Sequence, residues 1–350
     1  MKVVWVAYPG GAAAKEVPEL LGCAENALGL REFVRSKGHE LVSTSETGPA
    51  LDPILADAAV VIATPFWPAY ITRERLAKMP KVQLLLTAGV GSDHFDLAAA
   101  AERGLTVAEV TGSNVVSVAE HVVMQILALV RNFIPSYQEI VGGGWDIAKV
   151  AARSHDLEGM TVGIVGMGRI GQRVAERLRP FDVKVLYYDN RRLTTVEEDV
   201  LDARYRSLEA LLPVCDVISI NAPLTPATDR LFDAARLARM KKGAYLVNTA
   251  RGRIVDTQAL VDALQSGHLA GYAGDVWYPQ PAPKDHPWRT MPHHAMTPHV
   301  SGTTLEAQAR YAAGVRDCLE RFFDGRPLDR DFLIIEKGKF VSPSYSYAFA

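Results

Sequence analysis

Three polar residues in the C-terminal half of the chain could bind and orient a small carboxylate. Arg251 follows a predicted strand over residues 244–248, and its planar guanidinium can donate two parallel hydrogen bonds to one carboxylate. His299 lies in a Thr-Pro-His segment and is a titratable partner for such a site. Gln280 follows another predicted strand, over residues 271–276. Because ligands of open α/β sheets bind beyond the carboxyl ends of the strands, we expect these residues at one edge of a sheet.

A glycine-rich turn predicts a dinucleotide-binding unit around these residues. A short apolar strand pattern over residues 161–165 runs into Gly166-x-Gly168-x-x-Gly171 and then into a helical pattern. In such a motif the first glycine makes the tight turn, the second lets the backbone approach a pyrophosphate, and the third lets the helix pack against the strand. The next strand pattern ends at Asp189, where a carboxylate can bind the hydroxyls of an adenosine ribose.

Alternating strand and helix patterns predict the elements that position these residues. The first series has strands over residues 3–8, 60–63, 83–87 and 106–110, with helices over 25–37 and 73–78. The second has strands over residues 161–165, 183–188, 216–220, 244–248 and 271–276. Such alternation favours α/β domains. We predict two doubly wound parallel-sheet domains, with a Rossmann cofactor domain (residues 115–300) inserted into a discontinuous catalytic, substrate-binding domain (residues 1–114 and 301–350).

A long apolar segment is predicted to form a helix between the two series. Ser117 and Glu120 have the spacing of a capping box that opens this helix, and Pro135 is expected to stop it after Phe133. A helix that is apolar nearly all round should be buried between domains or between subunits. His121 on this helix is interpreted as a hydrogen-bonded packing residue. A last helix is predicted over residues 306–323, and the tail over 337–350 is left without an assigned role.

Composition excludes several classes of function. The chain has 350 residues, enough for two domains, and a net charge of −2 with acids and bases mixed along it. It lacks the basic stripe of a nucleic-acid-binding protein and an apolar run of membrane-spanning length. The three cysteines are widely separated, which suits a reducing compartment, and no metal-ligand spacing is evident. We expect a cytoplasmic enzyme that binds neither metal, membrane nor nucleic acid.

The motifs together resemble the NAD-dependent formate dehydrogenase family of the D-2-hydroxyacid dehydrogenase superfamily. The superfamily features are the glycine motif with Asp189, Thr-Ala-Arg-Gly at residues 249–252, Gly-Asp-Val at 274–276 and Thr-Pro-His at 297–299. The narrower resemblance covers residues 64–70, 86–94, 108–114, 278–288 and 299–304. The similarity extends from residue 22 to residue 335.

This resemblance implies that formate is oxidised to carbon dioxide by direct hydride transfer to NAD⁺, without a metal or an acid–base step. Arg251 would bind the formate oxygens, together with Asn114 and the backbone at Val90. His299, linked to Gln280, would donate a second hydrogen bond. An apolar wall would come from Pro65 and Phe66. The implied NAD contacts are Gly166, Gly168, Arg169, Ile170, Gly171, Asp189, Asn221, Pro223, Leu224, Thr225, Pro226, Ala227, Thr249, Asp275, His299, Ser301 and Gly302.

Gln280 distinguishes the candidate substrates. The resemblance places a glutamate there in related hydroxyacid dehydrogenases, where alcohol oxidation releases a proton as well as a hydride and needs a tuned general base. Formate oxidation moves only a hydride, so a neutral glutamine favours formate. Two alternatives stay open. One is a D-2-hydroxyacid dehydrogenase or glyoxylate reductase, and the other is a non-catalytic NAD(H)-sensing protein, which would not need Arg251, His299, Asn114 and Gln280 together.

The cofactor and the oligomeric state are also predicted. Asp189 repels a 2′-phosphate and so favours NAD over NADP, although Arg191 and Arg192 follow it and leave the degree of NADP tolerance open. The family resemblance implies a homodimer in which the long apolar helix pairs across a two-fold axis.

Overall fold

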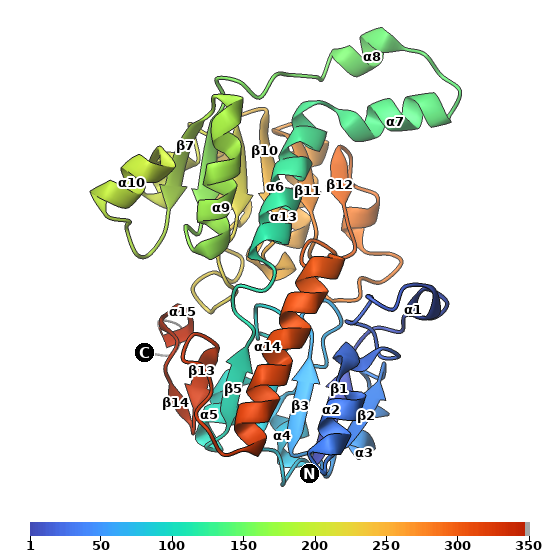
Figure 1. Ribbon diagram of the computed structural model, residues 1–350. Coiled ribbons are helices and arrows are strands. Elements are labelled where there is room, and N and C mark those ends of the chain that lie inside the picture. The colour runs from blue at the N-terminus through green and yellow to red at the C-terminus, as the bar shows by residue number, and fades with distance from the viewer. Residues whose placement is uncertain (347–350) are drawn as a thin grey trace. The chain divides into compact units, whose positions relative to one another are not determined.

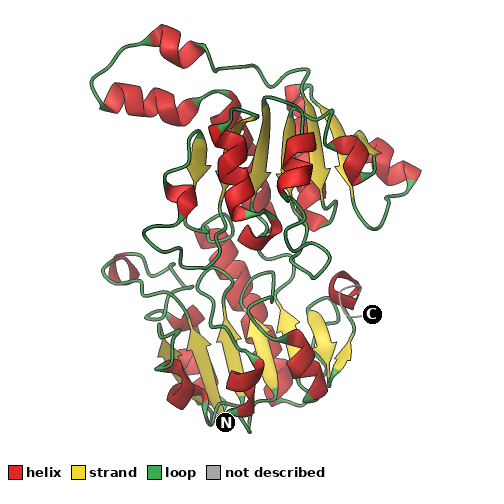
Figure 2. Cartoon of the chain, turned by 180° about the vertical axis from the view of Figure 1, so that it is seen from behind, coloured by secondary structure: helices red, strands yellow, loops and turns green. Residues whose placement is uncertain are grey.

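The structure of the chain is a computed structural model that describes residues 1–346. The chain forms two compact units, one of Met1–Asn114 and Gly302–Ala350 and the other of Val115–Ser301. Each unit is built on a seven-stranded sheet with helices packed on both faces (Figures 1 and 2). The predicted fold class, two α/β domains, is therefore confirmed. The assignment of the first unit as the substrate domain stays a prediction.

The sheet of the first unit is parallel except at one edge. Its strand order is β14-β13-β5-β4-β3-β1-β2, and the order 2-1-3-4-5 of its parallel strands is that of a flavodoxin-like sheet. The C-terminal segment supplies β13 and β14, which are antiparallel and were not predicted, because no clear period was recognised in the sequence from residue 332 on. The strands are β1 (Lys2–Val6), β2 (Glu40–Thr44), β3 (Val60–Ala63), β4 (Leu84–Thr87), β5 (Thr106–Glu109), β13 (Leu333–Glu336) and β14 (Lys339–Phe340).

Continuous apolar strands in this unit supply two cores, one on each face of the sheet. Successive side chains of a strand point to opposite faces. Val4 and Val6 of β1 accordingly pack into one apolar cluster, while Val3 and Trp5 pack into the other. The helices are α1 (Ala13–Glu16), α2 (Arg31–Ser36), α3 (Leu51–Leu55), α4 (Arg73–Ala77), α5 (Leu97–Glu102), α14 (Leu305–Phe323) and α15 (Pro343–Ser346), with a 3₁₀ turn at η1 (Ala27–Gly29).

The second unit has a fully parallel sheet of the Rossmann type. Its order, β12-β11-β10-β9-β6-β7-β8, contains the 3-2-1-4-5-6 order of dinucleotide-binding domains with one added strand. The strands are β6 (Thr161–Val165), β7 (Lys184–Tyr188), β8 (Ala203–Tyr205), β9 (Val217–Ile220), β10 (Ala244–Asn248), β11 (Leu269–Gly274) and β12 (His294–Met296). The remaining helices are α6 (Val115–Val130), α7 (Phe133–Val141), α8 (Ile147–Ala151), α9 (Arg169–Leu178), α10 (Thr195–Leu201), α11 (Leu208–Leu211), α12 (Ala234–Arg239) and α13 (Thr257–Gln265), with 3₁₀ turns η2 (Arg179–Phe181), η3 (Gly252–Ile254) and η4 (Pro287–Arg289).

Both predicted ends of the long helix were wrong. Helix α6 begins at Val115, so Ser117 is a buried residue inside the helix rather than its cap. The helix ends at Val130, and the chain turns at Asn132, which has a left-handed φ of 52°. Pro135 lies in the first turn of α7, where a missing N–H group breaks no intrahelical bond.

Helices α6 and α7 form a largely apolar stretch of the described chain. Within residues 1–346, no single helix has both the length and the apolar character to cross a membrane. Taken together, α6 and α7 reach the length and composition of a span, but the pair is bent by 67°.

Candidate active site

The three motif glycines of the second unit have three different surroundings. Gly166 has φ +95°, and a Cβ atom there would lie 2.6 Å from the backbone nitrogen of Ala222. A Cβ atom on Gly171 would overlap the carbonyl oxygen of Gly166, so helix α9 approaches β6 closely. Gly168 faces open space, with no atom within 4 Å of its Cβ position, and it caps the N-terminus of α9. A pyrophosphate fits beside Gly168, where the helix N-terminus favours an anion.

Asp189 is fixed across the glycine turn at the carboxyl end of β7. Its Oδ2 accepts a hydrogen bond from the Met167 amide at 2.7 Å, and its Oδ1 accepts one from the Arg191 amide at 2.9 Å. Each carboxylate oxygen keeps a further lone pair for a ribose hydroxyl. The Arg192 guanidinium lies 3.0 Å from Oε1 of the buried Glu198 and also packs over the Tyr205 ring, so its charge is engaged away from Asp189.

Two buried polar atoms at the same sheet edge have no hydrogen-bond partner among residues 1–346. They are Oδ1 of Asn221, directly after β9, and Oγ1 of Thr249, directly after β10. Such atoms need a partner, and polar groups of a bound cofactor can supply one. The sheet edge thus fits NAD, which supplies a hydride acceptor when it is bound. The other predicted contact residues after β9 form one loop, in which Leu224 and Thr225 are half-buried and Pro223, Pro226 and Ala227 are exposed. Arg169 and Ile170 open helix α9.

The structure brings His299 and Gln280 into direct contact. Nδ1 of His299, which is 9% exposed, lies 2.9 Å from Oε1 of Gln280. The Gln280 segment follows β11, and His299 follows β12, the strand paired with β11. The backbone of His299 is left-handed, with φ 57°.

Arg251 follows β10, the strand on the other side of β11. The buried Asn248 side chain holds its backbone, donating to the Arg251 carbonyl at 2.9 Å and accepting from the Ala250 amide at 3.0 Å. Gly252 packs so closely on the backbone of Trp277 that a Cβ atom would lie 2.5 Å from its carbonyl carbon. Arg251 is therefore held against the segment that leads to Gln280.

Asp275 is fully buried behind the His299 segment. Its Oδ1 accepts from the Val300 amide and its Oδ2 accepts from the Ser301 amide, both at 2.8 Å. Two of the predicted NAD contacts, Asp275 and Ser301, therefore bind each other.

The remaining predicted residues lie in the first unit. Val90, Pro65 and Phe66 are half-buried. Asn114 is half-buried too, and its buried Oδ1 has no hydrogen-bond partner in the part of the chain that the structure describes. Gly302 belongs to this unit as well, and a Cβ atom there would lie 2.7 Å from Nδ2 of Asn114.

A buried carboxylate orders the loop that contains Val90. Oε2 of Glu109 accepts from the Gly91 amide at 2.8 Å, from the Ser92 hydroxyl at 3.1 Å and from the Tyr345 hydroxyl at 3.0 Å. Tyr345 also accepts from the Ser92 amide at 3.2 Å. Sequence reasoning gave Glu109 and Tyr345 no role, because the residues that they join are far apart along the chain. Part of the tail, through Tyr345, thus packs in this unit, and residues 347–350 lie outside the described residues.

Two further observations complete the chemistry of the site. Within residues 1–346, no group of three or more histidine, cysteine, aspartate or glutamate side chains is arranged to bind a metal ion. His121 and Thr297 were not predicted as site residues, yet they hydrogen-bond each other next to Asp275. The Thr-Pro-His motif could have drawn attention to Thr297, because the hydroxyl of this residue can form hydrogen bonds.

Comparison with known proteins agrees with the fold. The family model of the D-isomer specific 2-hydroxyacid dehydrogenase NAD-binding domain matches residues 123–301. The match assigns the chain to this class of NAD-binding dehydrogenases, and it covers most of the Rossmann-type unit, Val115–Ser301.

Full-length relatives narrow the assignment. A mitochondrial formate dehydrogenase of Solanum tuberosum is 53% identical over 98% of this chain and 91% of its own length. The structure of a formate dehydrogenase from Granulicella m. is 49% identical, with a TM-score of 0.94 over 98% of this chain and all of the other. An NAD-dependent formate dehydrogenase from Staphylococcus aureus, solved in complex with NAD, is 51% identical, with a TM-score of 0.90 over 96% of this chain and 99% of its own. The chain belongs to the NAD-dependent formate dehydrogenase family, which confirms the predicted resemblance.

Proposed function

We propose that this protein oxidises formate to carbon dioxide and passes the hydride directly to NAD⁺. The formate carbon loses its hydrogen with both electrons of the C–H bond, and the carboxylate becomes carbon dioxide. No proton is released, so the reaction needs positioning and electrostatic stabilisation rather than a general base. Three of the four proposed catalytic residues, Arg251, Gln280 and His299, follow three adjacent strands of one sheet.

The contact between Gln280 and His299 carries this proposal. An amide can accept from the imidazole N–H or, after a turn of the side chain, donate to the imidazole nitrogen. A carboxylate can only accept and so favours the imidazolium form. The Gln280 amide therefore tolerates either protonation state of His299, which suits a reaction without proton transfer and does not suit alcohol oxidation.

We assign the substrate contacts as follows. The Arg251 guanidinium binds the formate oxygens in the fork geometry that suits a carboxylate, and His299 donates a second hydrogen bond. Asn114 and the backbone at Val90 contribute further donors, and Pro65 and Phe66 supply apolar surface. The donor of Asn114 is the amide NH₂ of its side chain, and the Glu109 carboxylate that orders the loop around Val90 supports the role of that backbone.

Steady-state assays with two substrates test the proposed function. Purified protein should reduce NAD⁺ with formate and should show little oxidation of NADH with glyoxylate. Substituting Arg251→Lys keeps the charge but removes the planar fork, so kcat/KM for formate should fall by about ten-fold or more. Arg204→Lys, at a half-exposed arginine of β8, is the control. Turnover of glyoxylate with no turnover of formate would contradict the proposal and favour a hydroxyacid dehydrogenase.

We also propose that the active form is a homodimer built on α6, α7 and α8. Helix α7 has no buried residue, and Phe133, Tyr137, Ile140 and Val141 are exposed at the spacing of one helical face. Trp145 and Ile147 beyond it are 79% and 68% exposed. Figure 1 shows α7 and α8 extending away from the sheet of their own unit. Helices this short are marginal in water without packing, so a second copy of this chain is the proposed cover.

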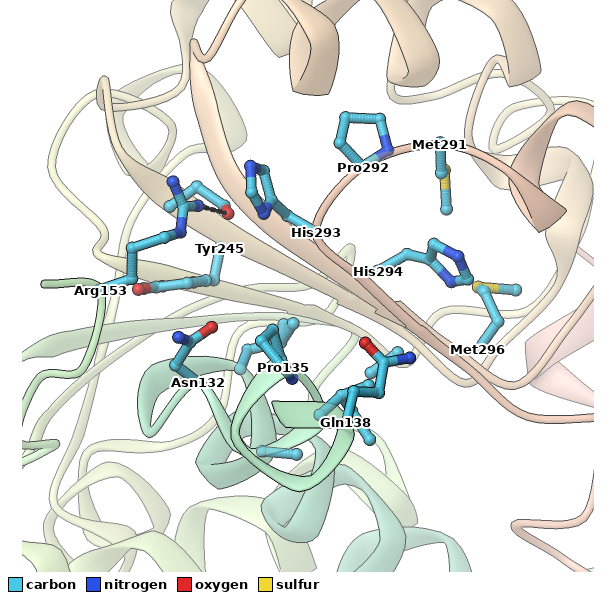
Figure 3. A pocket seen from close by; sticks show the side chains of 15 residues that line it. Asn132, Pro135, Gln138, Arg153, Tyr245, Met291, Pro292, His293, His294 and Met296 are labelled. Carbon is cyan, nitrogen blue, oxygen red and sulfur yellow. Dashed lines mark hydrogen bonds between the residues drawn. The ribbon is translucent and has the colours of Figure 1, made fainter. Parts of the chain in front are cut away.

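A cavity of about 510 Å³ beside α7 supports a self-complementary surface. Asn132, Pro135 and Gln138 line one wall, and His293 and Arg153 line another (Figure 3). The surface thus offers both protruding apolar groups and a recess, which two-fold symmetry would bring together.

Light scattering tests the dimer. The protein should have twice the 38.2 kDa mass of the chain, and Ile140→Glu should shift it toward the monomer. Val196→Glu, at a residue of α10 that is 72% exposed, is the matched control and should leave the dimer intact. A parent protein that stays monomeric, or binds lipid vesicles through this surface instead, would contradict the homodimer.

A cytoplasmic location is proposed as well. Cys23, Cys215 and Cys318 are buried and separate, and burial raises the pKa of Cys215 and of Cys318 to about 12. Such unpaired thiols favour a reducing compartment. Cell fractionation tests this location, and recovery with an organelle or an extracellular fraction would contradict it.

A further inference from the structure

The backbone on both sides of His299 is held by one buried carboxylate. Asp275 accepts from the Thr297 hydroxyl at 2.5 Å on one side, and from the amides of Val300 and Ser301 at 2.8 Å on the other. His299 itself has a left-handed backbone, which is costly for a residue other than glycine. The hydrogen bonds to Asp275 therefore help to hold a conformation that the segment would otherwise leave.

His121 supports this carboxylate from helix α6. Its Nε2 lies 3.2 Å from Oγ1 of Thr297 and 3.9 Å from Oδ1 of Asp275. A threonine hydroxyl has one proton, and a carboxylate that accepts three hydrogen bonds has none to give. The Thr297 proton has Asp275 as its nearest acceptor at 2.5 Å, with the Gly274 carbonyl at 3.3 Å. With the hydroxyl proton engaged by these acceptors, His121 must donate its Nε2 proton to Thr297.

The surroundings of His121 agree with a neutral ring that carries its proton on Nε2. Burial lowers the pKa of His121, an effect that the nearby Asp275 carboxylate partly opposes. The His121 side chain is 12% exposed and Asp275 is fully buried, so neither group can replace a lost partner easily with water. Helix α6 packs on β10, β11 and β12, and this packing fixes the position of His121 relative to the sheet.

We propose that His121 is a positioning residue for the substrate site, acting through Thr297 and Asp275 to hold the His299 segment in its binding conformation. This role rests on the proposed oxidation of formate, since it assigns the support of a residue in that site. It differs from a packing role, because it depends on one N–H donor rather than on the volume of the ring. His121→Leu removes the donor, whereas His121→Gln can place an amide N–H close to the position of Nε2.

Two measurements on the full-length protein separate these roles. Hydrogen exchange measures the exchange rates of the Val300 and Ser301 amides, which donate hydrogen bonds to Asp275. Steady-state kinetics measures kcat/KM for formate. In His121→Leu the two amides should exchange faster and kcat/KM for formate should fall by about five-fold or more, the effect of one lost hydrogen bond. Both values should recover substantially in His121→Gln. His155→Leu, at an exposed histidine of the same unit, should leave both unchanged.

A second pair of variants covers a failure of His121→Leu to fold. Thr297→Val removes the hydroxyl and keeps the shape, and Thr297→Ser keeps the hydroxyl. Faster amide exchange in the valine variant and not in the serine variant supports the proposal. Equal protection in all variants, or a His121→Gln variant no better than His121→Leu, would overturn it. If the parent protein fails to oxidise formate, the proposed function fails, while the exchange data still decide the role of His121.

Discussion

The Gln280 side chain meets the His299 ring at 2.9 Å, and this contact leads to a prediction at the scale of single residues. In Gln280→Glu the new carboxylate would stabilise the imidazolium form of His299. The pH range over which formate is oxidised should therefore become narrower than in the parent protein. Profiles of kcat/KM against pH measure this change. Gln258→Glu adds the same charge at an exposed residue of α13, and a narrowing there too would show that Gln280 is not specifically coupled to His299.

Asp189 leads to a second prediction at this scale. Asp189→Ser removes the negative charge that repels a 2′-phosphate and one acceptor for the ribose hydroxyls. A hydrogen bond to a charged group contributes about 1.5–3 kcal/mol, so the preference for NAD over NADP should fall by about ten-fold to a hundred-fold. The ratio of kcat/KM for the two cofactors measures it. Because Arg192 is engaged by Glu198, Arg192→Ala should change this ratio much less. An unchanged ratio in Asp189→Ser would remove Asp189 from cofactor selection.

Much of the site could be predicted from residues that follow strands in the sequence. Arg251 and Gln280 each follow a predicted strand within a few residues, and parallel strands bring such segments to one edge, whereas the short strand before His299 was not predicted. His121 and Tyr345 could not be found in this way, since each acts through partners more than 150 residues distant. Their roles follow from three-dimensional contacts that no local pattern encodes.

At the scale of elements, the C-terminal segment leads to a third prediction. Tyr345 donates to the buried Glu109, which also orders the loop around Val90. Tyr345→Phe keeps the ring and removes a donor to a buried carboxylate, a loss of about 1–3 kcal/mol. The melting temperature should fall, and the KM for formate should rise. Ser266→Ala, which removes an exposed hydroxyl at the end of α13, is the control and should change neither measurably. A Tyr345→Phe variant identical to the parent in both measurements would contradict this role of the tail.

The elements that were predicted correctly from the sequence have a clear hydrophobic periodicity or consist of a continuous apolar run. Strands β3, β6 and β10 have the predicted bounds because each is a continuous apolar run between polar turns. The start of α6 was misplaced because Ser117 and Glu120 have the spacing of a cap, although the helix has already begun at Val115. Strands β8, β12 and β14 have two or three residues each. Whether such short segments form strands depends on pairing with a neighbouring strand rather than on their own sequence.

At the scale of the whole molecule, buried histidines predict how stability depends on pH. Burial lowers the pKa of His121, His286 and His294 in the folded protein, so these rings bind protons less readily there than in the unfolded chain. The unfolded chain binds protons to the same rings below a pH of about 6.5. The free energy of unfolding should therefore fall as the pH is lowered from 7.5 to 5.5. Urea midpoints at the two values measure it, and an equal or higher midpoint at pH 5.5 would contradict the lowered pKa values.

The central claim is that formate gives its hydrogen directly to the nicotinamide. The most direct measurement follows deuterium from deuterated formate into the reduced cofactor, in ordinary water and by mass spectrometry. The account predicts one deuterium in each molecule of NADH formed, with none exchanged for solvent hydrogen. Reduced cofactor that carries solvent hydrogen, or no reduction with formate while glyoxylate is turned over, would contradict it.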